Sequence, residues 1–318
     1  MVVKATRFTV AGLLLICTVS LGIVWSSVSS KESYTVERRS VFHSSETSLS
    51  SLLAIPSNRL NGLDIAKLNL LCAQGLPGAE DLKLEDCMTK LDEMTTKVSS
   101  ETERHLYRFR QNPTEFENSE GYFRLIMLAV VLAEDFQIHY APDKISSIAD
   151  ARLGDGFFSD SHDVFLHGLT GGKHQGTCSS LPVLQVAVGR RLGYPVKLVT
   201  TKAHLFVRWE DSRERFNIEA AAQGVNRFSD DYYRHWPVEV SDEEVQAGNY
   251  LKSLTSAEEL AVFLSIRGMC WLDAKQYGEA AESFQAASRL APECQEYSEM
   301  AAQMEHRRIG KISASRAK

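Results

Sequence analysis

Basic residues are not in excess in this chain. Its 35 lysines and arginines are outnumbered by 41 aspartates and glutamates, so the formal net charge is −6. A clustered excess of lysine and arginine is the electrostatic signature of proteins that bind nucleic acid. Because the composition has no such excess, we expect no nucleic-acid partner.

Regularly spaced metal ligands are also lacking. Four ligand-type residues lie close together in a loop-rich passage, namely His162, Asp163, His167 and His174. Their spacing is irregular and no cysteine joins them, whereas structural zinc sites use short, regular spacings of cysteine and histidine. We interpret them as solvated loop residues, keep a metal site as the less favoured alternative, and expect no cofactor.

Long hydrophobic runs are few. Residues 125–132 form one of them, inside a helix that we predict at 119–136. Arg124 and Glu134 flank this run, so we assign the helix to a soluble core.

A second apolar run, at residues 8–28, follows the basic residues Lys4 and Arg7. It is long enough to cross a bilayer, and a basic segment before an apolar one is also typical of a secretory signal peptide. For residues 1–30 the length favours a single-pass anchor over a cleaved signal. Basic residues beside a membrane span tend to stay in the cytoplasm, so Lys4 and Arg7 orient the N-terminus inwards. The bulk of the chain is then expected outside the cytoplasm, in the periplasm or at the cell exterior.

Cysteine is sparse, with six in 318 residues. In a protein outside the cytoplasm, cysteines can pair as disulfides. Cys72 with Cys87 and Cys270 with Cys294 are the candidate local pairs, and unpaired buried thiols are equally consistent with the spacing. Either interpretation leaves Cys178 free.

The first part of the remaining chain is expected to be a tether followed by helices. Residues 31–58 are rich in serine with charged residues between, which is typical of a flexible linker. From residue 60 apolar residues recur at helical spacing. We predict helices over the ranges 63–71, 84–98, 103–109 and 119–136.

The stretch that carries chemistry begins at Gly176-Thr177-Cys178, directly before an apolar series at helical spacing. Thr177 can cap this helix and leave Cys178 in its first turn, although Pro182 removes a backbone donor there. Unsatisfied N–H groups and the helix dipole favour a thiolate at such a position. The alternative is a small buried hydrophobic residue at a helix start, which is the commoner role of a lone cysteine.

We predict strands over the ranges 196–200, 204–209 and 215–219. If Asp211 and Ser212 form the centre of the turn between the last two, His204 and Glu219 face each other across the hairpin. Directly opposed side chains have Cβ atoms about 4.5–5.5 Å apart, so the carboxylate can orient the imidazole. The imidazole can then take the proton of the Cys178 thiol, which assembles the nucleophile, base and orienting acid of covalent acyl chemistry.

This order, Gly-x-Cys at a helix start, then His and then an acid on successive strands, resembles the transglutaminase-like fold. That fold defines a papain-like cysteine superfamily of transglutaminases, amidases and peptidases. The closer similarity is to a bacterial subgroup with a helical N-terminal region and tetratricopeptide (TPR) repeats, and it covers most of residues 60–310. The resemblance implies that Cys178 is the nucleophile, His204 the general base and Glu219 the orienting acid. The superfamily usually has aspartate at the third position, and many members of the subgroup lack the cysteine.

Three neighbouring features are interpreted around this motif. Residues 159–173 are expected, from the resemblance, to form one wall of a substrate cleft. Gln175 or a neighbouring backbone N–H is a candidate to complete an oxyanion hole with the Cys178 amide. In the aromatic and polar stretch at 226–236, we expect Tyr232, Tyr233 and Trp236 to pack at the boundary with the next unit, and the less favoured alternative is that they line a cleft.

Residues 260–292 match the TPR signature at Gly268, Trp271, Tyr277, Ala280, Phe284, Ala287 and Pro292. A single repeat cannot bury both of its faces. We therefore expect this unit, residues 255–305, to dock on the preceding domain or pair with a degenerate neighbour. A protein partner bound through a TPR groove is the less favoured alternative, and residues 306–318 are predicted to be a basic, disordered tail.

Together these features predict an α+β fold. A transglutaminase-like domain at residues 59–250, with a helical subdomain and an antiparallel sheet, is followed by the TPR helix pair. The first function hypothesis is a membrane-anchored cysteine enzyme that acts on amide or peptide bonds of a peptide or protein substrate, hydrolysis being favoured over cross-linking. The second is a non-catalytic binding or scaffold protein with the same fold. The presence of both Cys178 and His204 favours the enzyme.

Overall fold

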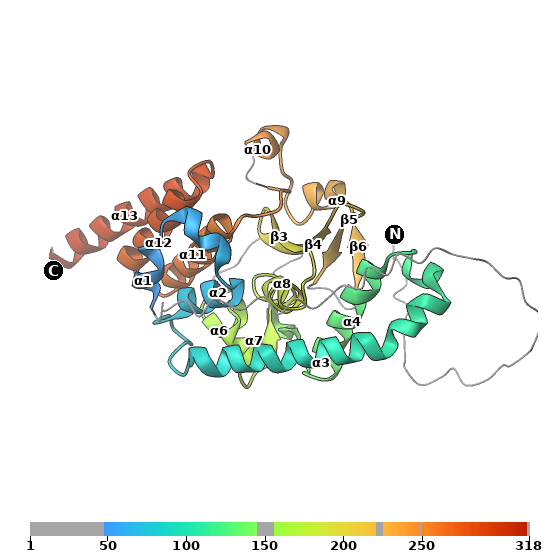
Figure 1. Ribbon diagram of the computed structural model, residues 1–318. Coiled ribbons are helices and arrows are strands. Elements are labelled where there is room, and N and C mark those ends of the chain that lie inside the picture. Colours follow the sequence, from blue (N-terminus) through green and yellow to red (C-terminus); the bar gives the residue numbers. More distant parts are fainter. Residues whose placement is uncertain (1–47, 145–155, 221–224, 248–249, 317–318) are drawn as a thin grey trace, which may run out of the picture. The chain divides into compact units, whose positions relative to one another are not determined.

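The structure is a computed structural model that describes residues 48–144, 156–220, 225–247 and 250–316 (Figure 1). These residues combine many helices with small sheets, which confirms the α+β prediction. The apolar run at residues 8–28 and most of the predicted linker lie outside the described residues. Within the ranges that the structure covers, no helix is both long and apolar enough to cross a membrane.

A helical region comes first in the described chain. It consists of α1 (Leu49–Leu53), η1 (Ser57–Gly62), α2 (Ile65–Ala73), α3 (Leu84–Gln111), η2 (Pro113–Phe116) and α4 (Glu120–Glu134). The hydroxyl of Ser48 caps α1, and α1 buries Leu52 against the core. The last part of the linker predicted at 31–58 therefore contains a short helix and the start of η1, and Leu52 is its buried residue.

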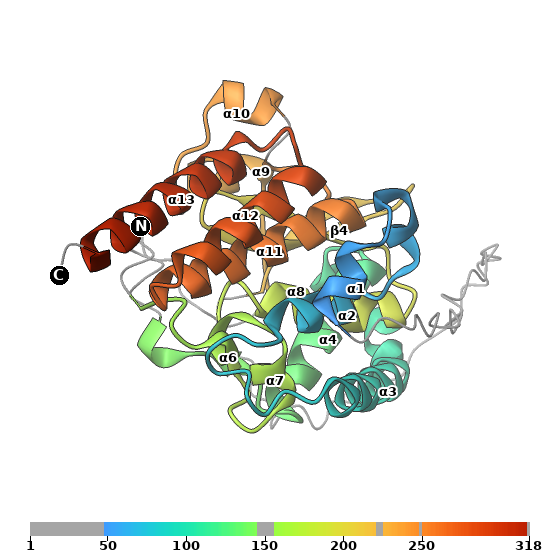
Figure 2. The ribbon, with the colours of Figure 1, turned by 90° about the vertical axis from the view of Figure 1, so that its left-hand side faces the viewer.

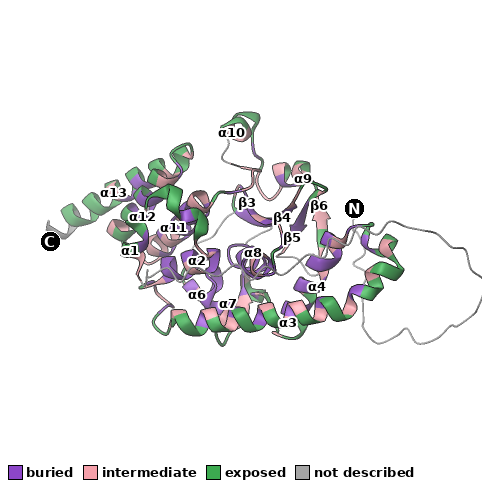
Figure 3. Cartoon of the chain, viewed as in Figure 1, coloured by how far each residue is buried: buried purple, intermediate pink, exposed green. Residues whose placement is uncertain are grey.

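The helix α3 is longer than predicted. The two helices predicted at 84–98 and 103–109 are one continuous element, because Thr102 continues the buried stripe between them. Apolar residues on one side of α3 are buried, while the other side carries charged, exposed residues (Figure 3). This arrangement is the one that an amphipathic surface helix adopts.

The main sheet lies against the helix α8 (Leu181–Arg191). It is an antiparallel meander in the order β3-β4-β5-β6, made of β3 (Val196–Thr201), β4 (His204–Glu210), β5 (Arg215–Glu219) and β6 (Asn226–Phe228). The helix α8 contacts β3 and β4 as well as α2, α3 and α4, so most of its side chains are buried. A second, small sheet pairs β1 (His139–Tyr140) in parallel with β2 (Gln175–Gly176), directly before Cys178.

Short helices complete the central region: η3 (Pro142–Lys144), α6 (Ser161–Val164), α7 (His167–Thr170), α9 (Asp230–His235) and α10 (Asp242–Gln246). The loop-rich passage at 159–173, expected from the resemblance to form one wall of a substrate cleft, contains the short helices α6 and α7. Val164, Phe165 and Leu166 within it are completely buried. The middle of the passage is therefore part of the core, whereas Ser159 and residues 171–173 are exposed.

The hairpin of β4 and β5 has a different register from the one predicted. Glu210 pairs with Arg215, so the ladder continues with Glu219 opposite Phe206 rather than opposite His204. Side chains alternate between the two faces of a sheet with a period of two, so His204 and Phe206 share a face with Glu219. The predicted direct pairing was wrong, but the two site residues are diagonal neighbours on the same face.

The last part of the described chain consists of α11 (Ser256–Asp273), α12 (Tyr277–Leu290) and α13 (Gln295–Arg316), each packed on the one before (Figure 2). A Cβ atom at Gly268 would lie 2.8 Å from the ring of Phe284, so only glycine allows α11 and α12 to approach this closely. The tail at 306–318 is helical as far as Arg316, because α13 continues through it. The prediction of disorder was wrong for that part of the tail.

The helix α11 docks on the preceding region. It contacts α2 and η1, and its buried residues belong to the same hydrophobic core. Glu259 of α11 is 1% exposed and accepts hydrogen bonds from the guanidinium of Arg190 on α8, with an Nη1–Oε2 distance of 3.0 Å. Burial raises the pKa of Glu259, and Arg190 offsets part of that rise.

All the cysteines that the structure describes are free thiols. The candidate disulfides Cys72–Cys87 and Cys270–Cys294 are thus not formed in this part of the chain. Burial raises the pKa of Cys72 to about 12 and that of Cys294 to about 11, so both thiols stay protonated at neutral pH.

Candidate functional site

Cys178 lies in a tight turn between β2 and α8. The N–H of Leu181 donates to the Thr177 carbonyl at 3.0 Å, and the Thr177 hydroxyl oxygen accepts from the Ser179 N–H at 3.3 Å. Thr177 thus binds an N–H within the turn, but the N-cap residue of α8 is Ser180. The prediction that Thr177 caps the helix and leaves Cys178 in its first turn was wrong. The helix α8 itself begins only at Leu181, because Pro182 has no N–H and interrupts the first turn.

Hydrogen bonds to α6 hold this turn in place. The hydroxyls of Thr177 and Ser180 both donate to the backbone carbonyl of Asp163, each at 3.0 Å. Both hydroxyls are buried, so these bonds are made away from water and are costly to break. They fix the backbone on both sides of Cys178, which is 3% exposed.

His204 is the first residue of β4 and follows a two-residue turn in which Ala203 has a positive φ of 59°. Its Nε2 lies 2.8 Å from Oε2 of Glu219, and both side chains are almost inaccessible to solvent. Diagonal neighbours in a sheet are about 7–8 Å apart, farther than opposed ones. A glutamate, one methylene longer than aspartate, suits this distance.

The two ring nitrogens of His204 have different surroundings. Nε2 donates to Glu219, whereas Nδ1 is buried and makes no hydrogen bond with the described residues. Burial lowers the pKa of His204, but the interactions with the side chains of Cys178 and Glu219 outweigh burial and raise it from 6.5 to about 10. Since Nε2 is bound to Glu219, Nδ1 is the ring nitrogen that is left to accept a proton from the thiol. The imidazole is therefore a strong base placed between a sulfur and a carboxylate.

Protonation of His204 is expected to stabilise the fold in a defined pH window. The folded pKa, about 10, is above the ordinary value of 6.5, so this contribution is complete below pH 6.5 and is lost as the pH rises towards 10. The difference in unfolding free energy between wild type and His204→Gln should shrink across that window. Urea denaturation at a series of pH values measures it, with the exposed His235→Gln as control. A difference that does not change with pH would contradict the expectation.

Tyr140 is a residue of the site that sequence reasoning missed. Its hydroxyl is buried and makes no hydrogen bond with the described residues. Burial raises the pKa of Tyr140, and the neighbouring side chain of Cys178 contributes to the rise. Tyr140 pairs with Gly176 in the parallel ladder, and Gly176 is two residues before Cys178. A two-residue strand leaves no periodicity in the sequence, so no local signal pointed to it.

Of the two candidates for the oxyanion hole, the side chain of Gln175 and a neighbouring backbone N–H, the structure bears only on the first. Gln175 pairs with His139 in the ladder, and its side-chain Nε2 is 3.4 Å from Nε2 of His139. Neighbouring residues of a strand point to opposite faces. Gln175 therefore lies on the face away from Tyr140, and its side chain is not placed beside Cys178.

Aromatic side chains surround His204 on the sheet. The ring of Trp236, which is half-buried, meets the imidazole edge-on at a centroid distance of 4.7 Å. Tyr233 is completely buried and stacks on Phe206 at 3.7 Å, and Tyr232 lies against Trp236 at 5.5 Å. The stretch 226–236 thus packs over the site itself rather than at the join to α11.

His162 and His167 lie side by side, with His167 buried and His162 half-buried, so the interpretation of His167 as a solvated loop residue was wrong. His162 Nδ1 lies 2.8 Å from Oδ1 of Asp160, and the rings of His162 and His167 are 4.6 Å apart. Burial lowers the pKa of His167 to about 4, so this ring is neutral at neutral pH. Among the described residues no group of His, Cys, Asp and Glu is arranged to hold a metal ion.

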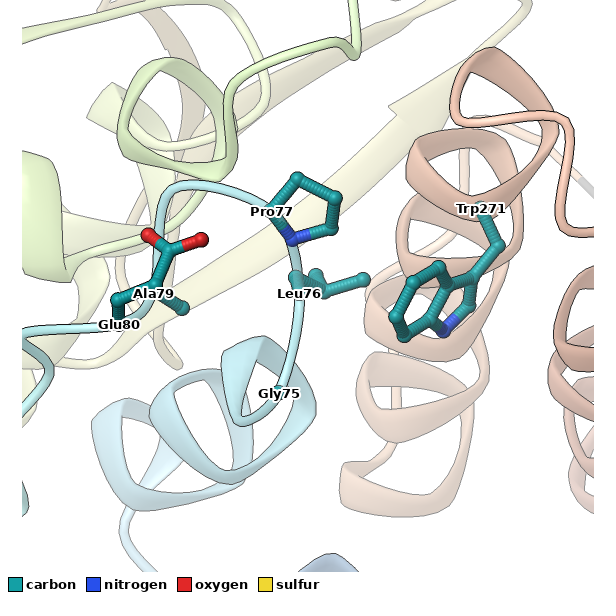
Figure 4. A pocket seen from close by; sticks show the side chains of 6 residues that line it. All are labelled: Gly75, Leu76, Pro77, Ala79, Glu80 and Trp271. Atoms are coloured by element: carbon teal, nitrogen blue, oxygen red, sulfur yellow. The ribbon is translucent and has the colours of Figure 1, made fainter.

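A shallow hollow of about 260 Å³ lies between the turn after α2 and the helix α11. It is lined by Gly75, Leu76, Pro77, Ala79, Glu80 and Trp271 (Figure 4). None of Cys178, His204 and Glu219 contributes to this hollow, and Glu80 is its only charged residue.

Comparisons of this chain with protein-family models, with curated proteins and with solved structures found no match. The functional argument therefore depends on the geometry of the site.

Proposed function

We propose that this chain is a cysteine enzyme of transglutaminase-like type that cleaves amide or peptide bonds through an acyl-enzyme. One observation carries the proposal: His204 is buried with its Nε2 2.8 Å from Glu219, and the side chain of Cys178 is near enough to raise the pKa of its imidazole. A buried imidazole with a raised pKa and a carboxylate behind it is the base that a thiol nucleophile requires. A lone structural cysteine requires neither partner.

The proposed reaction has two steps. The Cys178 thiol gives its proton to His204 Nδ1, and the sulfur attacks the carbonyl carbon of the amide. The negative charge that forms on the carbonyl oxygen would be stabilised by donors near Cys178, and the candidates are its own N–H and the Tyr140 hydroxyl, which is buried without a hydrogen-bond partner among the described residues. His204 then protonates the leaving amine as the C–N bond breaks. In the second step water, deprotonated by His204, attacks the thioester and releases the acid and the free thiol.

Location and partners are part of the same proposal. The basic residues Lys4 and Arg7 before the apolar run at 8–28 suit a single-pass anchor, with the enzyme outside the cytoplasm acting on a peptide or protein. The pair α11 and α12 would be a TPR unit that serves mainly as support, since α11 contributes its apolar face to the core.

A non-catalytic scaffold is the second candidate function. Burial favours it, because Cys178 is 3% and His204 4% exposed. An acyl donor has to reach the sulfur, whereas a binding protein that keeps only the fold has no such requirement. The reactivity of the thiol separates the two candidates.

Alkylation by iodoacetamide across a pH series tests the proposal. We expect Cys178 to be modified rapidly at about pH 6.5, and His204→Ala to slow this modification about 100-fold, because an ordinary thiol is only about 1% thiolate at that pH. The exposed His235→Ala is the control and should react like wild type. Peptide mass mapping of residue 178 gives the rate. A Cys178 that reacts only above about pH 8.5 in wild type would favour the scaffold.

A further inference from the structure

Glu219 has a second donor besides His204. The hydroxyl of Tyr233 donates to Glu219 Oε2 at 3.1 Å, and His204 Nε2 binds the same oxygen at 2.8 Å. Tyr233 is 0% exposed, so this bond is made away from water. Burial raises the pKa of Tyr233, and the nearby Glu219 raises it further, so the hydroxyl remains a donor at every physiological pH.

The ring of Tyr233 is held rigidly. It stacks on Phe206 with a centroid distance of 3.7 Å and an interplanar angle of 2°. Its backbone carbonyl accepts a hydrogen bond from the Thr201 hydroxyl at 2.7 Å. Both partners are strand residues that flank His204 in sequence, so the sheet fixes Tyr233 and His204 together.

The start of α9 is also anchored. Asp230, its first residue, accepts hydrogen bonds from Arg208 at 2.6 Å, from Asn217 at 2.7 Å and from Arg215 at 2.9 Å. These donors come from β4 and β5, the strands that carry His204 and Glu219. The helix that presents Tyr233 is thus tied to the same two strands as the site.

We propose that Tyr233 is a positioning residue, whose hydroxyl holds the Glu219 carboxylate so that His204 faces Cys178. The inference rests on the proposed function. Glutamate has one more rotatable bond than aspartate, and it reaches His204 along a diagonal, so its carboxylate needs a second fixed contact. The Tyr233 hydroxyl and His204 Nε2 both bind Oε2, so the tyrosine supplies this contact at the same oxygen that orients the imidazole.

The variant Tyr233→Phe removes the hydroxyl and keeps the stacked ring, and Tyr232→Phe, at the next residue and half-exposed, is the matched control. Acylation by p-nitrophenyl acetate and alkylation by iodoacetamide are measured over a pH series. We expect Tyr233→Phe to lower the limiting acylation rate about tenfold, the effect of one lost hydrogen bond to a charged group, with an unchanged half-saturating ester concentration. The pH at which alkylation is half-maximal should also move. Tyr232→Phe should match wild type in all three quantities, and thermal melting checks that both variants fold.

The outcomes separate the two ideas. If wild type is reactive and Tyr233→Phe equals it, or if both tyrosine variants lose the same amount, the positioning role is overturned while the proposed function stands. If wild-type Cys178 is itself unreactive, the proposed function fails. The NMR signal of the His204 Nε2–H then decides the role of Tyr233: a signal that is unchanged in Tyr233→Phe overturns it, and one that is lost or shifted supports it.

Discussion

Replacing Glu219 by glutamine is expected to slow the acylation of Cys178 by on the order of 10³-fold or more, as when the carboxylate of a Ser-His-Asp triad becomes an amide. Burial lowers the pKa of His204, and the side chain of Cys178 together with the Glu219 carboxylate holds it near 10. A neutral amide offers no such charge. Its NH₂ group can also face Nε2, and the imidazole then carries its proton on Nδ1 and cannot accept one from the thiol.

The measurement is the burst of p-nitrophenol from p-nitrophenyl acetate, with the acyl adduct confirmed by intact mass. Glu210→Gln is the matched control, since Glu210 is a carboxylate of β4 that accepts hydrogen bonds from Ser253 and Arg215 away from the site. Glu219→Asp keeps the charge but loses one methylene of reach along the diagonal, so its rate should fall between wild type and Glu219→Gln. A Glu219→Gln rate within a few-fold of wild type would remove Glu219 from the proposed triad.

Replacing Phe284 by alanine is expected to lower the free energy of unfolding by about 3–5 kcal/mol, the usual loss for a buried phenylalanine. Its ring is 2% exposed and fits against Gly268, with Ala280, Ala281, Ala301 and Met304 in the same cluster. Alanines cannot extend into the space that the ring leaves, so the cavity would remain. The opposite face of α11 belongs to the main core, so loosening this helix pair weakens the whole domain.

Urea denaturation gives the free energy directly. Tyr107→Ala is the control, because Tyr107 lies on α3 and is 53% exposed, and its loss should be within about 0.5 kcal/mol of wild type. A change below about 1 kcal/mol for Phe284→Ala would mean that α11 and α12 are not held together by this contact. An early, separate unfolding transition would mean that the helix pair is not cooperative with the domain on which it docks.

The candidate site was largely readable from local patterns. A cysteine before an apolar helix, a histidine at a strand start and an acid on the returning strand are features of neighbouring residues. The predicted centre of the β4–β5 turn was wrong by one residue, which shifts the pairing of the two strands by two positions. Because side chains alternate between faces with a period of two, His204 and Glu219 still share a face. The helix pair at 260–292 could also be predicted, because the spacing of its small and aromatic residues matches the TPR signature.

The sequence by itself thus determined the α+β class, the amphipathic helices, and the residue types and face of the site, because each depends on periodicities of two or 3.6 within a short window. Only the tertiary structure decided that Tyr140 lies beside Cys178, that Tyr233 shares an oxygen of Glu219 with His204, and that Arg190 meets Glu259. These contacts join segments between 14 and 69 residues apart. They are set by how helices and strands pack, and packing between distant segments leaves no periodic trace in the chain.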